Sequence, residues 1–267
     1  MLKSTDKDIL ARKHYADSSK LAVRKRFGRL SNPPTTFEGD IIDFLLEKRP
    51  ARVLDAGCGN GDLLAKLRKR GFGGELHGID ISDGMIREAK ARSEKENAHI
   101  HFQVADAQDI PFESGFFDAI ICKHMLYHVP NPQKAVDEFY RCLTPKGALI
   151  ITLNSIKNKP QFFHCEEMVC RKHSVKSADH GQQFVNVENV GKYLERFSRI
   201  DTAFKEGKVN APELFVAYFD SMRDNFEPEP SDALWKKIVE DVARYVEENK
   251  RNGFVETNVV GMTTATK

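Results

Sequence analysis

Three aspartates stand at the carboxyl ends of successive strand-like runs: Asp55, Asp80 and Asp106. The carboxyl ends of parallel strands meet at one edge of a sheet, where nucleotides bind. A carboxylate after the second strand can accept both hydroxyls of a ribose, and an acceptor after the third suits the exocyclic amine of adenine. These carboxylates can also cap the helices that follow. As a set they predict a site for an adenosine-containing ligand.

The first aspartate opens a glycine-rich turn, DAGCGNG at 55–61, followed by helical apolar spacing over 62–68. Glycines allow a tight turn and let a ligand approach the main chain. A strand, a glycine-rich turn and a helix start form a nucleotide-binding crevice. The nicotinamide fingerprint G-x-G-x-x-G is disfavoured, because the third glycine comes one residue early.

Two histidines and a tyrosine follow the fourth strand-like run: His124, Tyr127 and His128. Histidine is the side chain whose ordinary pKa suits base catalysis near neutral pH. We expect His128 as the first candidate for a general base and His124 as the second. The alternative is structural, with His128 capping the next helix and His124 packing under a lid.

The elements that position these residues alternate between strands and helices. Strands are predicted near 51–55, 75–79, 99–104, 117–122 and 147–153, with a helix over 36–48 before the first. This alternation predicts an α/β fold with a parallel sheet and helices on both faces. After residue 154 the pattern changes to helices at 159–173, 187–196, 211–225 and 231–250, and strands at 197–204 and 253–266.

Five motifs in order resemble the class I S-adenosylmethionine-dependent methyltransferases, in the small-molecule branch of the type 11/25-like enzymes. They are VLDAGCGNG at 53–61, GID at 78–80, DAQDIPF at 106–112, FDAIICKHMLYHVPNP at 117–132 and LTPKGALIITLNS at 143–155. The match covers about residues 50–155. It implies a Rossmann-like seven-stranded sheet whose last strand is antiparallel. It also implies one domain over 1–267, with a helical lid formed by 1–50, 155–180 and 206–252.

The resemblance implies S-adenosyl-L-methionine as cofactor and S-adenosyl-L-homocysteine as product. Around the methionine part it places Asp55, Ala56, Gly57, Cys58, Gly59 and the backbone of Cys122 and Lys123. Around the adenosine it places Asp80, Ile81, Met85, Asp106, Ala107 and Gln108. Arg24 would pair with the cofactor carboxylate, and Tyr15 would line the methyl site.

Methyl transfer from a sulfonium is an in-line displacement that depends mainly on positioning. A base is required only when the attacking atom carries a proton. We therefore expect methyl transfer to an oxygen, nitrogen or carbon of a small molecule. An RNA or tRNA methyltransferase is the alternative suggested by basic residues around Arg24, and a non-catalytic cofactor-binding subunit is another.

Composition narrows these possibilities. The 267 residues carry a net charge of +2, which argues against nucleic acid as partner. No apolar run is long enough to cross a bilayer, and the polar start predicts a cytoplasmic protein. Five cysteines without a C-x-x-C pair predict reduced thiols and no metal.

Aromatic residues are frequent in the predicted lid, and they have two interpretations. They would line an apolar pocket for an aromatic substrate, or they would form the lid's own core. The residues are Phe162, Phe163, Phe215, Tyr218, Phe219 and Phe226.

Overall fold

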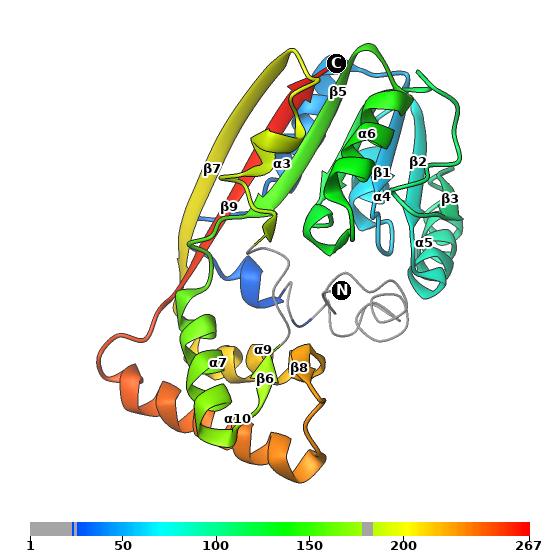
Figure 1. Ribbon diagram of the computed structural model, residues 1–267. Coiled ribbons are helices and arrows are strands. Elements are labelled where there is room, and N and C mark those ends of the chain that lie inside the picture. The colour runs from blue at the N-terminus through cyan, green and yellow to red at the C-terminus, as the bar shows by residue number, and fades with distance from the viewer. Residues whose placement is uncertain (1–22, 24–25, 178–183) are drawn as a thin grey trace.

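The structure, a computed structural model, describes residues 23, 26–177 and 184–267. Its centre is a seven-stranded sheet in the order β3-β2-β1-β4-β5-β9-β7 (Figure 1). The strands are β1 (Arg52–Ala56), β2 (Glu75–Asp80), β3 (His101–Val104), β4 (Phe117–Lys123), β5 (Leu143–Asn154), β7 (Arg199–Val209) and β9 (Glu256–Thr266). The first five run parallel, and β9 is antiparallel to both β5 and β7. The predicted Rossmann-like sheet with an antiparallel last strand is confirmed.

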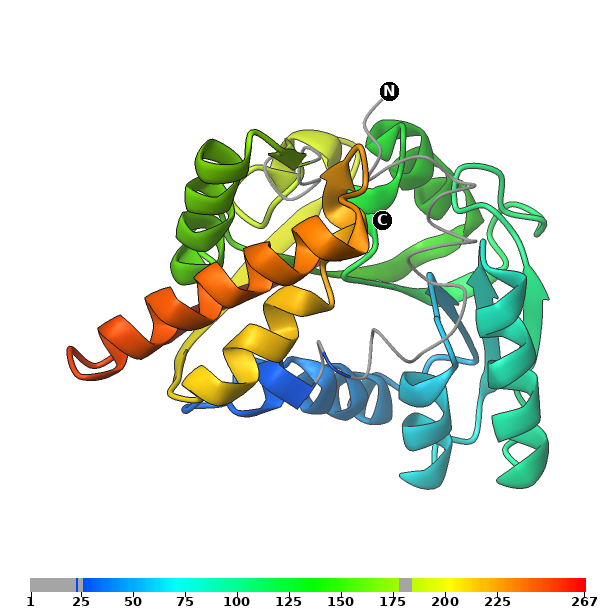
Figure 2. The same cartoon turned by 90° about the horizontal axis from the view of Figure 1, so that it is seen from below.

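Helices cover both faces of the sheet (Figure 2). On one face lie α3 (Glu38–Lys48), α4 (Asp62–Lys69) and α5 (Asp83–Lys95), and on the other lies α6 (Pro132–Cys142). The first three share one hydrophobic cluster with β1 and β4, whereas α6 packs in a second cluster with β4 and β5. A strand buried on both faces reads as a continuous apolar run, and β4 shows this in Phe117, Ala119, Ile120, Ile121 and Cys122, all buried.

A helical cap lies beyond the carboxyl ends of the parallel strands (Figure 1). It consists of α7 (Pro160–His173), α9 (Pro212–Asp220) and α10 (Asp232–Lys250), with a small ribbon of β6 (Lys176–Ser177) and β8 (Phe226–Glu227). Helix α3, which the lid prediction included, packs against the face of the sheet through Ile41, Ile42 and Leu45.

The aromatic residues of the cap form its hydrophobic core. Phe215, Phe219 and Phe226 are fully buried, and Phe219 stacks on Trp235 with ring centroids 6.0 Å apart. Phe162 and Tyr218 are buried in the same cluster. Helical spacing of apolar side chains serves packing in most helices. The structure therefore favours the core interpretation of these aromatics over the pocket interpretation.

Boundaries differ from prediction mainly after β5. The strand predicted at 197–204 extends over Arg199–Val209, because it pairs with β9 along its whole length. The helix predicted at 187–196 is only the short 3-10 turn η4 (Val190–Tyr193). The helix predicted at 211–225 ends at Asp220 and is followed by η5 (Arg223–Asn225). No helix in the described part of the chain is both long and apolar enough to cross a membrane.

Candidate cofactor-binding site

The glycine-rich turn after β1 is closed onto the end of β2. The backbone N–H groups of Gly57 and Cys58 both donate to the carbonyl of Ile79, at 2.8 and 2.9 Å. The N–H of Gly59 donates to Oδ2 of Asp80 at 2.9 Å. Parallel pairing of β1 with β2 places Asp55 and Asp80 at the same edge of the sheet. The structure thus brings the first two predicted acidic residues to one edge, as the sequence spacing requires.

Gly57 and Gly59 of this turn both have positive φ, for different reasons. Gly57 has φ of 79°, and a Cβ there would lie 2.5 Å from Cγ of Met125. Gly59 has φ of 54°, and a Cβ there would meet nothing within 4 Å. Gly57 is therefore required by the packing of the loop that follows β4. At Gly59 the backbone borders open space, which suits the close approach of a ligand.

Asp80 is the best-placed acceptor of the set. Its Oδ1 accepts from the N–H of Ser82 at 2.9 Å, in addition to the bond from Gly59. Burial raises the pKa of Asp80, and the backbone hydrogen bonds only partly offset this effect. A carboxylate has about four lone-pair sites, so the backbone donors of Gly59, Ser82 and Ile81 leave capacity for a ribose hydroxyl.

Cys58 is not a nucleophile in this arrangement. Burial raises the pKa of its thiol well above the ordinary value, and the neighbouring charges of Asp55 and Asp80 act in the same direction. The thiolate is the reactive form of cysteine. Cys58 is therefore a small buried residue of the turn, and Gly78 leaves room for its sulfur, since a Cβ at Gly78 would lie 2.9 Å from it.

The loop after β3 is held in place by Gln108. The backbone N–H of Gln108 donates to Asp106 at 2.9 Å, and its amide nitrogen reaches both carboxylate oxygens at 3.2 Å. Its side-chain oxygen accepts from the N–H of Asn131 at the start of α6. Gln108 and Ala107 are buried. Gln108 thus braces Asp106, a role that the sequence reasoning did not assign to it.

The two apolar residues predicted beside adenine lie on either side of the N-cap of α5. Ser82 caps this helix by accepting from the N–H of Met85. Met85 is buried, whereas Ile81 is partly exposed at the end of β2. Of the two, Ile81 is the one with surface open to a ligand.

The end of β4 carries the candidate base residues. Cys122 is fully buried in the sheet, and burial raises the pKa of its thiol. His124 has φ of 52°, and its N–H donates to the carbonyl of Thr152 at 2.9 Å. A non-glycine residue in this left-handed region is uncommon, and such residues concentrate at functional sites. His128 lies in the turn η3 (Leu126–His128), with its ring 4.6 Å from that of Tyr127.

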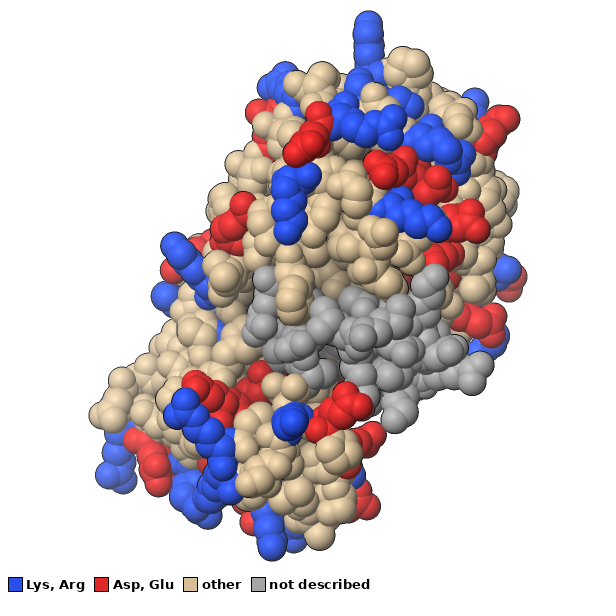
Figure 3. Space-filling view, in the orientation of Figure 1, with Lys and Arg blue, Asp and Glu red and all other residues tan. Residues whose placement is uncertain are grey.

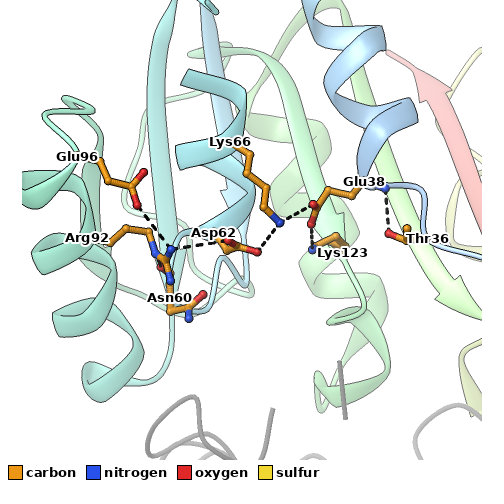
Figure 4. Close-up of polar contacts among 8 residues, drawn as sticks. All are labelled: Thr36, Glu38, Asn60, Asp62, Lys66, Arg92, Glu96 and Lys123. Atoms are coloured by element: carbon orange, nitrogen blue, oxygen red, sulfur yellow. Dashed lines mark hydrogen bonds and ion pairs between the residues drawn. The ribbon is translucent and has the colours of Figure 1, made fainter. Parts of the chain in front are cut away.

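A chain of charged side chains crosses the same edge of the sheet (Figure 4). It joins Arg92 of α5, Asp62 and Lys66 of α4, Glu38 of α3 and Lys123 at the end of β4. Sequence reasoning missed it because its members are far apart in the chain. The only sequence signal is the i,i+4 spacing of Asp62 and Lys66.

Some predicted residues fall elsewhere. Tyr15 and Arg24 lie outside the residues that the structure describes. His164, on the cap helix α7, is exposed and packs against Tyr245 with ring centroids 5.1 Å apart. Among residues 23, 26–177 and 184–267, no group of three potential ligands could hold a metal ion.

Comparison with known proteins supports the family predicted from the motifs. Residues 54–151 match the family model described as a methyltransferase domain. A demethylmenaquinone methyltransferase of Thermus thermophilus is 36% identical over 110 residues, which is 41% of this chain and 50% of that protein. A ubiquinone biosynthesis O-methyltransferase of Xanthomonas oryzae is 34% identical over 117 residues, covering 43% and 48%. The chain spans about half the length of the curated relatives it matches.

Solved structures share the fold over most of the chain. The YcgJ protein of Bacillus subtilis aligns with a TM-score of 0.60 and 18% identity, over 86% of this chain and 97% of that one. Phosphoethanolamine N-methyltransferase 2 of Haemonchus contortus, in complex with S-adenosyl-L-methionine, aligns with a TM-score of 0.59 and 21% identity, over 98% and 59%. At these identities the likeness establishes the fold alone.

Proposed function

We propose that this chain, which carries a methyltransferase domain at residues 54–151, transfers a methyl group from S-adenosyl-L-methionine to a small molecule. The observation that carries the proposal is the closure of the glycine-rich turn onto Asp80. It leaves a partly buried carboxylate and an open glycine backbone at the carboxyl edge of the sheet. A ribose with its attached chain fits that combination.

The residues present fit this cofactor, which supplies a methyl group on a good leaving group. Asp80 would accept the ribose hydroxyls, Ile81 would cover the adenine, and Asp106 would accept from its amine. Gly59 would let the methionine part approach the main chain, with Asp55 nearby. The protein holds these groups on strand ends, which fixes the geometry for an in-line displacement.

The acceptor atom would approach from the end of β4. We assign His128 as the first candidate for the base that removes a proton from an oxygen or nitrogen acceptor, and His124 as the second. Replacing the residue that acts as the base by alanine should lower kcat by about 100-fold or more. The KM should change much less. Turnover unchanged in both alanine variants at every pH would contradict the assignment.

The substrate class rests on the relatives and the cap. The two curated relatives are named for demethylmenaquinone and ubiquinone biosynthesis, so phenolic and quinone-type acceptors are the first to screen. The cap helices α7, α9 and α10 serve as the proposed lid. On the face shown in Figure 3, acidic and basic side chains of the described residues are interspersed, unlike the continuous basic surface of nucleic-acid-binding proteins. The free cysteines support the cytoplasm as the proposed location.

Calorimetric titration with S-adenosyl-L-methionine and with S-adenosyl-L-homocysteine tests the proposal. We expect micromolar binding of both, followed by methyl uptake by a phenol, amine or small acid. Binding without methyl uptake by any acceptor would favour a non-catalytic binding subunit. A folded protein that binds neither ligand would contradict the proposed function.

A further inference from the structure

Six charged side chains form a continuous ion-pair network across the carboxyl edge of the sheet, which we call the edge network: Glu38, Asp62, Lys66, Arg92, Glu96 and Lys123 (Figure 4). Lys66 is its centre, with Nζ 2.6 Å from Oε1 of Glu38 and 2.8 Å from Oδ2 of Asp62. Oε2 of Glu38 lies 3.6 Å from Nζ of Lys123. Oδ1 of Asp62 lies 3.7 Å from Nη1 of Arg92.

The two ends of the edge network reach the two loops of the proposed site. At one end, Nε of Arg92 donates to the carbonyl of Asn60 at 3.2 Å, inside the glycine-rich turn. At the other end, Lys123 is the last residue of β4 and directly precedes His124. Glu38, in the first turn of α3, is the acidic residue that pairs with Lys123 within the described part of the chain. The network therefore joins the turn that would hold the cofactor to the loop that carries the candidate base.

Glu38 is held in its charged form at this position. It is partly buried, with about a quarter of its side chain exposed. Burial acts to raise its pKa, but the hydrogen bond from Lys66 and the charge of Lys123 outweigh that effect, so the pKa of Glu38 is lowered. The pKa of Lys66 is raised, because its bonds to Asp62 and Glu38 outweigh burial. Partly buried pairs are screened by salt much less than exposed ones.

We propose that Glu38 is a positioning residue, which sets the placement of the β4 end relative to the glycine-rich turn through Lys66 and Lys123. This inference rests on the proposed function. Glu38 is the anion that pairs with both Lys66 and Lys123. Removing its charge would take away the link between these two lysines. Both loops would then lose a fixed point, although neither Glu38 nor Lys66 is assigned a contact with cofactor.

The test compares Glu38→Gln with Asp43→Asn. Asp43 is the matched control, because it also joins α3 to α4, through an exposed pair with Arg70 at 3.1 Å. We expect Glu38→Gln to raise the Kd for S-adenosyl-L-homocysteine about three- to ten-fold, as coupled neighbours do. Asp43→Asn should leave the Kd within two-fold. Amide hydrogen exchange of the ligand-free variants should become faster at 57–61 and 123–128 in Glu38→Gln only.

Double variants separate positioning from general destabilisation. If Glu38 acts through Lys123, the effects of Glu38→Gln and Lys123→Met on the Kd are less than additive, while Glu38→Gln and Asp43→Asn add. A wild-type Kd and wild-type exchange in Glu38→Gln would overturn the inference and leave the proposed function intact. Failure of the wild type itself to bind the ligand would contradict the proposed function and the inference that rests on it.

Discussion

Asp80 combines a structural and a binding task in one carboxylate. It closes the glycine-rich turn through Gly59, caps the start of the next loop through Ser82, and remains available at the sheet edge. The helix-capping alternative considered for the three aspartates does not describe Asp80, because the side chain of Ser82 caps α5. Asp106 also holds its own loop, since it accepts from the N–H of Gln108.

Replacing Asp80 by asparagine should weaken cofactor binding. The amide keeps one acceptor oxygen for the turn but loses the charge that strengthens bonds from ribose hydroxyls, worth about 1.5–3 kcal/mol. We expect the Kd for S-adenosyl-L-homocysteine to rise about ten-fold or more in calorimetric titration. Asp83→Asn is the control, because Asp83 is exposed on the next helix and pairs with Arg87. An unchanged Kd in the Asp80 variant would remove the ribose assignment.

The pH dependence of binding should report the raised pKa of Asp80. Burial makes protonation easier than in an ordinary aspartate, whose pKa is 3.8. Protonation turns an acceptor into a donor, so affinity should fall as pH decreases through a range that begins above that ordinary value. Burial makes the ionised form of Asp80 unfavourable in the folded state. The free energy of unfolding should therefore decrease as pH rises from the ordinary pKa of 3.8 towards the raised pKa. In Asp80→Asn the affinity should not vary with pH there.

At the scale of elements, the turn after β1 contacts both the end of β2 and the loop after β4. The turn after β1 bonds to the end of β2, and its Gly57 lies against Met125 of the loop after β4. This contact explains why residue 57 must be a glycine, whereas the sequence shows it only as one of three glycines at alternate positions. The edge network adds a polar link between the same loops.

Gly57 and Gly59 should respond differently to replacement by alanine. Gly57→Ala introduces both a left-handed alanine and a clash with Met125, so we expect a loss of about 2–4 kcal/mol in the free energy of unfolding. Gly59→Ala carries the conformational cost alone, about 1 kcal/mol. Urea denaturation measures both. Equal losses in the two variants would show that the loop can move away from residue 57. The added methyl at residue 59 should still weaken cofactor binding, since it enters the open space.

At the scale of the whole molecule, the cap is joined to the sheet by three connections and a buried acidic residue. The chain passes from β5 to α7, from β7 to α9 and from α10 to β9. At the start of β9, Glu256 is fully buried and accepts from the N–H groups of Gln161, Phe162 and Thr257. Burial raises the pKa of Glu256, and these bonds oppose the shift. Glu256 thereby binds the first turn of α7 to the sheet.

Trp235 offers a test of that coupling. It is the single tryptophan of the chain, it is buried in the cap, and its indole N–H donates to Asp220 at 2.6 Å. Because the cap is held to the sheet at several points, we expect its fluorescence transition in urea to coincide with loss of far-UV circular dichroism. Saturating S-adenosyl-L-homocysteine should raise both midpoint urea concentrations together. At a ligand concentration of 100 times the Kd, the free energy of unfolding should increase by about 2.7 kcal/mol. A fluorescence transition at lower urea would show that the cap unfolds independently.

The sequence by itself determined the parallel sheet and the acidic residues at the strand ends. Both follow from local patterns, since a strand buried on both faces must be apolar and its carboxyl end must lead into a loop. The antiparallel last strand was implied by the resemblance of the motifs to a family. The glycine spacing and the motif order predicted the methyltransferase domain that residues 54–151 match. Boundaries after β5 were less well predicted, because the lengths of β7 and β9 depend on their pairing with each other.

Only the tertiary structure decided which side chains of the site touch. The side chain of Gln108 donates to Asp106, and Gly57 leaves room for Met125. Glu38 pairs with Lys66, 28 positions away, and with Lys123, which is farther along the chain. It also decided that the aromatics of the cap are its core. Contacts between residues far apart in sequence leave no periodic signal, because each depends on how separate elements pack. The sequence therefore located the edge of the sheet where chemistry is expected, and packing fixed the arrangement of side chains along it.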